Sequence, residues 1–240
     1  MTEVSAHRGG SEHATGATYE AYQDALASGA EYVEFDIRKT RDNVLVDYHD
    51  ARLLHEGPLI ETLSYAEVCD RLGFPVPKVQ DVMEMIAGKM MGHLDLKETG
   101  YEEDVIRLAA GILGQGNVIA TTLEDVSVAA IKRSFPAVRA ALSLGRDLSG
   151  VPRIRRARVR QSELFPIRRL RNCGADWAAV NYKIARLGAS KVCKHYGIGV
   201  MVWTVDSDPM ISQCLSDQKI HVLITNRPYR AVRLRSETAP

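Results

Sequence analysis

The chain has 240 residues, 45% of them hydrophobic, which is enough to bury the core of one α/β barrel in a single domain. Its formal net charge of +1 argues against a protein dedicated to nucleic-acid binding. The N-terminus shows no basic segment followed by an apolar one, and no stretch approaches the roughly 20 apolar residues that span a bilayer. We therefore expect one domain over residues 1–240 of a soluble, cytoplasmic protein that does not bind nucleic acid.

The first predicted elements follow a strand, helix, strand order. Apolar runs rich in β-branched residues predict strands at residues 4–7 and 32–36. Between them, a helical pattern predicts a helix at residues 19–27, and Gly29 is placed to end it. This order is typical of a βα unit in a parallel sheet.

A hairpin interrupts the rhythm after the second strand. Only seven residues separate Asp36 from the next apolar run, at residues 44–49, and a crossover helix usually needs a dozen or more. We therefore predict a β-hairpin with its turn at residues 40–43, centred between positions 42 and 43. That register sets His49 opposite Asp36 and returns the histidine to the mouth of the barrel.

The rest of the chain repeats the alternation of strands and helices. Further strands are predicted at residues 91–96, 118–121, 139–144, 177–181, 200–205 and 222–225. Helices are predicted at residues 102–113, 126–134 and 189–195, with Gly114 and Gly197 as C-terminal caps and Pro209 in the first turn of another helix. The polar tail at residues 236–240 is expected to fray. Eight strands, each followed by a segment that can be helical, predict a (β/α)8 TIM barrel with a hairpin extending strand two.

Acidic residues gather where active sites of such barrels lie, at the C-terminal ends of the strands. Glu34 and Asp36 end the second strand and, two residues apart, point to the same face. Asp95 brings a third carboxylate from the next strand of the barrel. Three oxygen ligands suit Mg²⁺ or Ca²⁺ better than a metal that prefers thiolates. The sequence therefore predicts a site for one divalent cation.

Basic residues lie at the same strand ends. His7 and Arg8 end the first strand, Lys97 follows Asp95, and the hairpin returns His49 to the same rim. Each has a structural explanation when taken alone, since a histidine at a strand end can be a hydrogen-bonded structural residue and an Asp–Lys pair can simply neutralise itself. Their coincidence at neighbouring strand ends favours a functional site.

Several segments resemble, in order and spacing, the signature of the glycerophosphodiester phosphodiesterase family. The first part consists of His-Arg-Gly at 7–9, Gly-Ala-Glu-Tyr-Val-Glu-Phe-Asp at 29–36, Thr-Arg-Asp-Asn at 40–43 and His-Asp at 49–50. Later segments that resemble family landmarks are Val-Pro at 76–77, His-Leu-Asp-Leu-Lys at 93–97, Trp-Thr-Val-Asp at 203–206 and Ile-Thr-Asn-Arg-Pro at 224–228. The resemblance covers nearly the whole chain.

This resemblance implies metal-dependent hydrolysis of glycerophosphodiesters to an alcohol and glycerol 3-phosphate. By it, the three carboxylates hold the metal, His7 and His49 act as general acid and base, and Arg8 and Lys97 contact the phosphate. Histidine suits acid–base work because its pKa lies near neutrality. Trp203 resembles the aromatic residue of the family's substrate cleft, although a large aromatic in a barrel can equally be a packing residue.

Two departures from the family pattern leave other readings open. The usual Pro-Glu-Asn-Thr run is replaced by residues 15–18, so Gly16 stands where an acid is expected. Asp95 stands where many members have Glu, which shortens that ligand by one methylene. Both departures favour, as the alternative, action on phospholipids like that of the sphingomyelinase D and lysophospholipase D enzymes. A barrel that binds without catalysis is a third reading, with Gly16 as its one positive sign.

An arginine-rich stretch lies between the fifth and sixth predicted strands. From Arg146 to Arg171 there are nine arginines and only two acids, Asp147 and Glu163. The ordinary interpretation is a solvated loop and helix face. The alternative is a positive rim that steers anionic phosphodiesters or contacts an acidic membrane surface, which would bring lysophospholipid substrates within reach.

Overall fold

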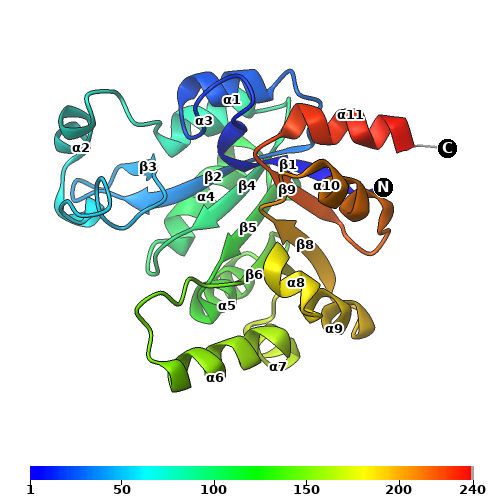
Figure 1. Cartoon of the computed structure of the whole chain (residues 1–240). Coiled ribbons are helices and arrows are strands. Elements are labelled where there is room, and N and C mark those ends of the chain that lie inside the picture. Colours follow the sequence, from blue (N-terminus) through cyan, green and yellow to red (C-terminus); the bar gives the residue numbers. More distant parts are fainter. Residues whose placement is uncertain (239–240) are drawn as a thin grey trace.

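The computed structural model describes residues 1–238. Its strands follow the order β1-β9-β8-β7-β6-β5-β4-β2-β3, and β1 also pairs with β2. That last pairing closes eight parallel strands into a ring, with the antiparallel β3 bonded outside it. The helices surround this ring (Figure 1). The predicted (β/α)8 barrel with a hairpin on its second strand is confirmed.

Four strands match their predicted bounds, and the others differ from them by at most three residues. They are β1 Glu3–Ala6, β2 Tyr32–Lys39, β3 Leu45–Asp47, β4 Met91–Leu96, β5 Val118–Thr122, β6 Arg139–Leu144, β7 Trp177–Asn181, β8 Gly199–Trp203 and β9 Val222–Thr225. Alternate residues of each strand point into the barrel, where they form a cluster of Tyr32, Ile119, Ala141, Ala179, Met201, Val222 and Ile224. The other face of the strands packs against the helices in the main core.

The helices include the four that the sequence predicts. They are α1 Tyr19–Ala25, α2 Tyr65–Leu72, α3 Val79–Ile86, α4 Glu102–Ile112, α5 Asp125–Ser134, α6 Arg153–Leu164, α7 Ile167–Cys173, α8 Tyr182–Arg186, α9 Ala189–His195, α10 Asp208–Ser216 and α11 Pro228–Thr238. Pro209 lies in the first turn of α10, as expected. Residues 236–238, expected to fray, belong to α11, while 239–240 lie outside the described residues.

The register of the hairpin differs by one residue from the prediction. Ile37 lies opposite Asp47, and the backbone N–H of Tyr48 donates to the carbonyl of Asp36 at 2.9 Å. Asp36 therefore faces Tyr48, and the prediction that it faces His49 is wrong. Since side chains alternate along a strand, this shift exchanges the faces to which the residues of the returning strand point.

The loop of the hairpin explains the shift. The N–H of Thr40 donates to the carbonyl of Val44 at 3.0 Å, which leaves three residues in the loop. Asn43 takes a left-handed conformation with φ of 61°. A three-residue loop that ends in a left-handed residue is a common hairpin connection, and it centres this hairpin on position 42.

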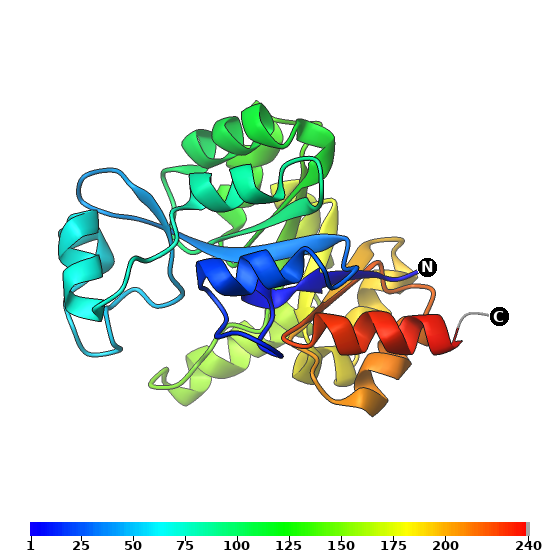
Figure 2. The same cartoon turned by 90° about the horizontal axis from the view of Figure 1, so that it is seen from above.

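The hairpin opens an insertion that reaches beyond the barrel. A separate small core of Val46, Leu53, Ile60, Leu63, Val68 and Val76 stabilises it. Figures 1 and 2 both show α2 standing away from the ring at the far end of this insertion. The insertion carries His49 from β3 toward the mouth of the barrel. Within the described part of the chain, none of the helices has the length and apolar character needed to cross a membrane.

Candidate active site

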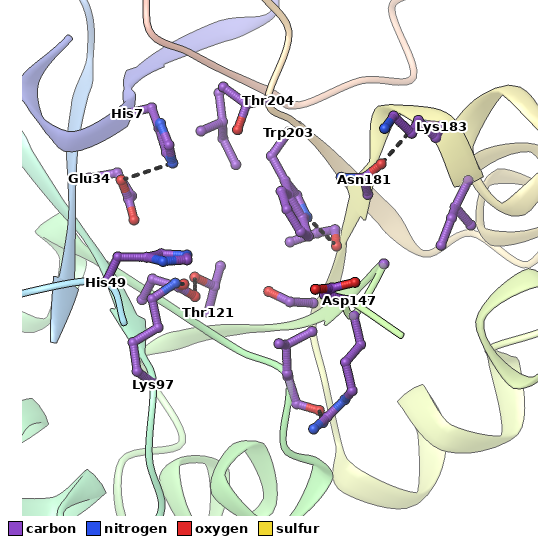
Figure 3. A pocket seen from close by; sticks show the side chains of 18 of the residues that line it. His7, Glu34, His49, Lys97, Thr121, Asp147, Asn181, Lys183, Trp203 and Thr204 are labelled. Carbon is purple, nitrogen blue, oxygen red and sulfur yellow. Dashed lines mark hydrogen bonds and ion pairs between the residues drawn. The ribbon is translucent and has the colours of Figure 1, made fainter. Parts of the chain in front are cut away.

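A cavity of about 680 Å³ opens at the C-terminal ends of the strands (Figure 3). Seven of the eight predicted site residues line it, namely His7, Arg8, Glu34, His49, Asp95, Lys97 and Trp203. The eighth, Asp36, is 1% exposed and lies beneath Arg8 and Lys97. The structure therefore brings together every residue that the strand-end argument singled out.

A strained turn after β1 positions Arg8. This arginine takes a left-handed conformation with φ of 52°, which is uncommon for a residue with a side chain. Gly9, with φ of 80°, allows the turn because a Cβ there would lie 2.8 Å from the backbone carbon of Ala21. As a result, the Arg8 N–H donates to Glu34 at 2.9 Å and its Nε lies 2.7 Å from Asp36.

Three carboxylates meet below this turn. Ligand oxygens of Glu34, Asp36 and Asp95 lie within 4.8 Å of one another. Lys97 places its ammonium 2.7 Å from Asp36 and also pairs with Asp95. Among residues 1–238, neither buried oxygen of Asp36 has a partner with hydrogen-bonding geometry, although a cation lies near each. A metal ion bound by these oxygens would give them the coordination partner that they lack.

The electrostatics of the cluster support the same conclusion. Burial, together with the neighbouring Asp36 and Asp95, raises the pKa of Glu34 well above its usual value. Burial would also raise the pKa of Asp36, but Lys97 and Arg8 outweigh it and hold that pKa below its usual range. The two basic side chains thus compensate one carboxylate and leave the charge of Glu34 unbalanced. A divalent cation would supply the missing positive charge.

A chain of hydrogen bonds inside the barrel orients Asp95. The Thr121 hydroxyl donates to Asp95 at 2.6 Å and accepts from Nε2 of His93 at 3.0 Å. The Nδ1 of His93 then accepts from the Ser5 hydroxyl, also at 3.0 Å. Burial lowers the pKa of His93 to about 4, so this histidine is neutral in the core. The sequence offered no sign of this support beyond the polar residues within otherwise apolar strands.

His7 is held by a pair of residues whose roles sequence reasoning missed. The Nδ2 of Asn226 donates to Asp206 at 2.8 Å, which turns the amide oxygen toward Nδ1 of His7 at 2.7 Å. Nδ1 must therefore carry the proton, and Nε2 is directed toward Glu34 at 3.9 Å. Burial, reinforced by Arg8, lowers the pKa of His7. The signal for Asn226 was its place at the end of the last strand.

His49 lies across Glu34 from His7, at the end of the hairpin (Figure 3). Its Nδ1 donates to Asp50 at 2.7 Å, and Arg38 donates to its carbonyl at 2.8 and 3.0 Å. Burial and the charge of Lys97 lower the pKa of this imidazole as well. Both histidines are therefore oriented through Nδ1.

The far wall of the cavity belongs to the second half of the barrel. Trp203 lies across from the two histidines, and its indole N–H donates to the carbonyl of Ala179 at 3.0 Å (Figure 3). Asp147, Asn181 and Lys183 lie beyond it. The ring of Trp203 is partly exposed in the cavity and fixed by its hydrogen bond, so it offers a rigid apolar wall.

Comparisons with known proteins identify the family of the chain. A sequence model of the Glycerophosphoryl diester phosphodiesterase family matches residues 7–230. The chain belongs to this family. The resemblance noted in the sequence is thereby confirmed, and with it the expectation of a phosphoric diester hydrolase.

Relatives of the phosphodiesterase agree with this assignment. A glycerophosphodiester phosphodiesterase of Bacillus altitudinis is 24% identical over 259 residues, covering 99% of each chain. A lysophospholipase D of Mus musculus is 38% identical over 68 residues, which are 27% of this chain and 21% of that protein. A phosphodiesterase of Oleispira antarctica, solved with the product sn-glycerol-3-phosphate, matches with a TM-score of 0.72 and 18% identity over 98% of this chain and 97% of that one.

The segment that departs from the family pattern packs against the His-Arg-Gly turn. A Cβ at Gly16 would lie 3.3 Å from the carbonyl oxygen of Gly10 and 3.4 Å from that of Arg8. The next residue, Ala17, donates its N–H to the same Arg8 carbonyl at 2.9 Å. The phosphodiesterase thus braces the strained turn through the backbone N–H of Ala17, and a side chain at Gly16 would lie close against the same turn.

Proposed function

We propose that the protein hydrolyses glycerophosphodiesters to an alcohol and glycerol 3-phosphate, with one divalent cation and two histidines. The observation that carries the proposal is that three clustered carboxylates lie at or just beneath the wall of a single cavity, which a pair of histidines, His7 and His49, also lines. Such a pair can remove a proton from the attacking hydroxyl and return one to the leaving alkoxide. Family membership and the product-bound relative support the choice of substrate.

The cation, Mg²⁺ or Ca²⁺, would be held by Glu34, Asp36 and Asp95. When bound, it supplies positive charge that offsets the charge of the phosphodiester and helps to orient it. Oxygen donors suit both ions, and the orphaned oxygens of Asp36 fit either.

The chain's own residues perform the remaining tasks. Arg8 and Lys97 stand over Asp36 with their charged groups at the cavity wall, where they would bind the phosphate oxygens. His7 and His49 would exchange protons through Nε2, since Nδ1 of each is already engaged. Trp203 would pack against the glycerol or the leaving alcohol and exclude water from that side.

The test uses glycerophosphocholine, with choline and glycerol 3-phosphate as measured products. Activity should disappear with EDTA and return with Mg²⁺ or Ca²⁺. His7→Gln and His49→Gln should each lower kcat by about 10²- to 10⁴-fold, because acid–base assistance is typically of that size. His195→Gln is the matched control, since His195 is exposed on α9 and does not line the cavity.

Three outcomes would contradict parts of the proposal. Wild-type turnover in either active-site variant would reject the acid–base pair. Full activity after exhaustive chelation would reject the cation. If the wild-type protein hydrolyses none of the diesters but still binds glycerol 3-phosphate, the barrel binds its ligand without catalysis.

A second candidate function is the release of the alcohol from lysophospholipids or sphingomyelin. The observation that favours it is a hollow of about 460 Å³ beneath α6, which shares Leu123, Ser143 and Arg146 with the active-site cavity. Its lining is mixed: Leu148, Val151 and Val159 provide an apolar part against which an acyl chain would pack, beside three arginines, two serines and Glu163. The short match to a lysophospholipase D also supports it.

The two candidates are separated by comparing lysophosphatidylcholine and sphingomyelin with glycerophosphocholine at equal concentrations. Val151→Arg narrows the hollow without touching the carboxylate cluster. If the hollow receives the acyl chain, this variant should lose activity on the lipid alone. An equal loss on both substrates, or none, would reject this role.

A further inference from the structure

We propose that the outer end of α6, together with α7, is a docking surface for an anionic lipid membrane. Nine arginines lie between Arg146 and Arg171, but the structure divides them into two groups. Three are paired with acids: Arg146 with Glu124 at 2.7 Å, Arg160 with Glu163 at 2.6 Å, and Arg169 with Asp125 at 2.6 Å. The pairs of Arg146 and Arg169 join the segment to residues that follow β5, and the pair of Arg160 lies within α6.

The other six arginines form a surface that we call the arginine face. Its members are Arg153, Arg155, Arg156, Arg158, Arg168 and Arg171, and all six are exposed. None of them has an ion-pair partner within residues 1–238. A group of exposed cations without local acids projects a positive field into solvent.

The placement of these charges is unfavourable for the stability of α6 itself. Arg153 and Arg156, and likewise Arg155 and Arg158, are three residues apart on one helix, a spacing at which like charges repel. All four lie in the first half of α6, where the helix dipole already favours negative charge. A surface that meets an external polyanion would reverse both penalties.

The first half of α6 is also exposed to solvent on every side. Residues 152–158 are all exposed, so this end of the helix projects from the barrel instead of covering it. In Figures 1 and 2 it extends toward the side on which β3 and α2 project. The other end of α6 reaches the active site, since Arg160 lines the catalytic cavity. A membrane bound to the arginine face would therefore lie beside the cavity mouth.

Exposed apolar side chains favour lipid over a soluble anion or a nucleic acid. Ile154 on α6 is 74% exposed, Phe165 between α6 and α7 is 67% exposed, and Leu187 at the cavity rim is 72% exposed. A small phosphodiester needs only the cations already at the carboxylate cluster, and six arginines spread over two helices cannot converge on it. Basic residues interleaved with apolar ones are typical of a surface that lies on anionic headgroups.

Binding of the intact protein to vesicles tests the proposal without relying on catalysis. The probes are vesicles of phosphatidylcholine with and without phosphatidylglycerol, measured by flotation at low and high ionic strength. Binding should require phosphatidylglycerol and weaken with salt. Arg153→Gln/Arg156→Gln/Arg158→Gln should lower the partition coefficient by about 100-fold, at roughly fivefold for each arginine. Glutamine keeps the helix propensity of the segment.

The matched control removes the same charge at the opposite end of the barrel. Lys89→Gln/Arg133→Gln/Lys219→Gln changes three exposed basic residues that precede strands, and it should bind vesicles like the wild type. Both triple variants should keep wild-type turnover of glycerophosphocholine, so loss of docking is distinguished from loss of the proposed reaction. Equal loss in both variants, no binding to anionic vesicles, or preference for duplex DNA over the vesicles would overturn the proposal.

Discussion

The contact between Asn226 and His7 leads to a prediction about His7, which we propose as an acid–base residue. Asn226→Leu removes the 2.7 Å acceptor for Nδ1 of His7 and leaves Asp206 without its side-chain amide partner. When His7 takes a proton it becomes charged, and a hydrogen bond to a charged group contributes about 1.5–3 kcal/mol. Its loss should lower kcat by about 10- to 150-fold.

Exchanging the two partners separates orientation from simple packing. In the double variant Asp206→Asn/Asn226→Asp the side-chain hydrogen bond between the two positions can form with donor and acceptor reversed, and a carboxylate accepts from Nδ1 of His7. A nearby opposite charge raises the pKa of a histidine by about one unit or more. Because a general base acts only when unprotonated, the acidic limb of kcat/KM should move to higher pH.

The assay is the pH profile of kcat/KM for glycerophosphocholine at saturating metal, with thermal unfolding followed by circular dichroism to check that each variant folds. A kcat of the Asn226→Leu variant within twofold of the wild-type kcat would refute the orienting role of Asn226. A double variant that is folded and active, yet has its acidic limb at the wild-type position, would show that His7 is not the group observed in that limb.

Three further predictions concern the metal cluster, the buried histidine and the strained turn. Asp36→Asn should raise the metal concentration needed for half-maximal activity by about tenfold or more, because a carboxylate ligand is lost; an unchanged requirement in a metal titration would contradict this. His93 has a folded pKa of about 4 against 6.5 when unfolded, so the unfolded state binds its proton first and stability should fall by about 3 kcal/mol between pH 6.5 and pH 4. Urea unfolding at several pH values measures this dependence. In the His93→Gln variant the free energy of unfolding should change less between pH 6.5 and pH 4, and the same slope in both proteins would contradict the prediction. Gly9→Ala should destabilise the fold by about 1–3 kcal/mol more than Gly73→Ala, since both glycines have positive φ but only Gly9 has backbone within 3 Å of a new Cβ; equal losses in urea unfolding would show that the contact relaxes.

The sequence by itself determined the barrel. Apolar runs with a period of two marked the strands of the ring, and the short connection after Asp36 marked the hairpin, because burial and chain length act within a few residues. The same strand-end argument selected the acids and histidines that gather in the cavity. Parallel strands end at one rim, so position along each strand was sufficient for His7 and the three acids, whereas His49 was placed there by a hairpin whose register was predicted one residue off.

The helical segments that were not predicted include α2, although Ser64 and Glu67 form a capping box at its start and Gly73 ends it, and the first half of α6. The insertion that carries α2 has its own small core, whose contacts join residues far apart in the chain. The first half of α6 has no buried stripe, so its hydrophobic period gave no indication of a helix. The place of α2 in the fold depends on those long-range contacts, whereas residues 153–158 of α6 are exposed on every side and offer no apolar period.

Only the tertiary structure decided the details on which chemistry depends. The hairpin register turned on one left-handed residue, Asn43, and a one-residue change exchanges the faces of a strand. Asn226 and His7 are 219 positions apart, and no local pattern indicates that one orients the other. The sequence fixes local periodicity, whereas hydrogen bonds between strand ends exist only after the barrel has closed and brought its first and last strands together.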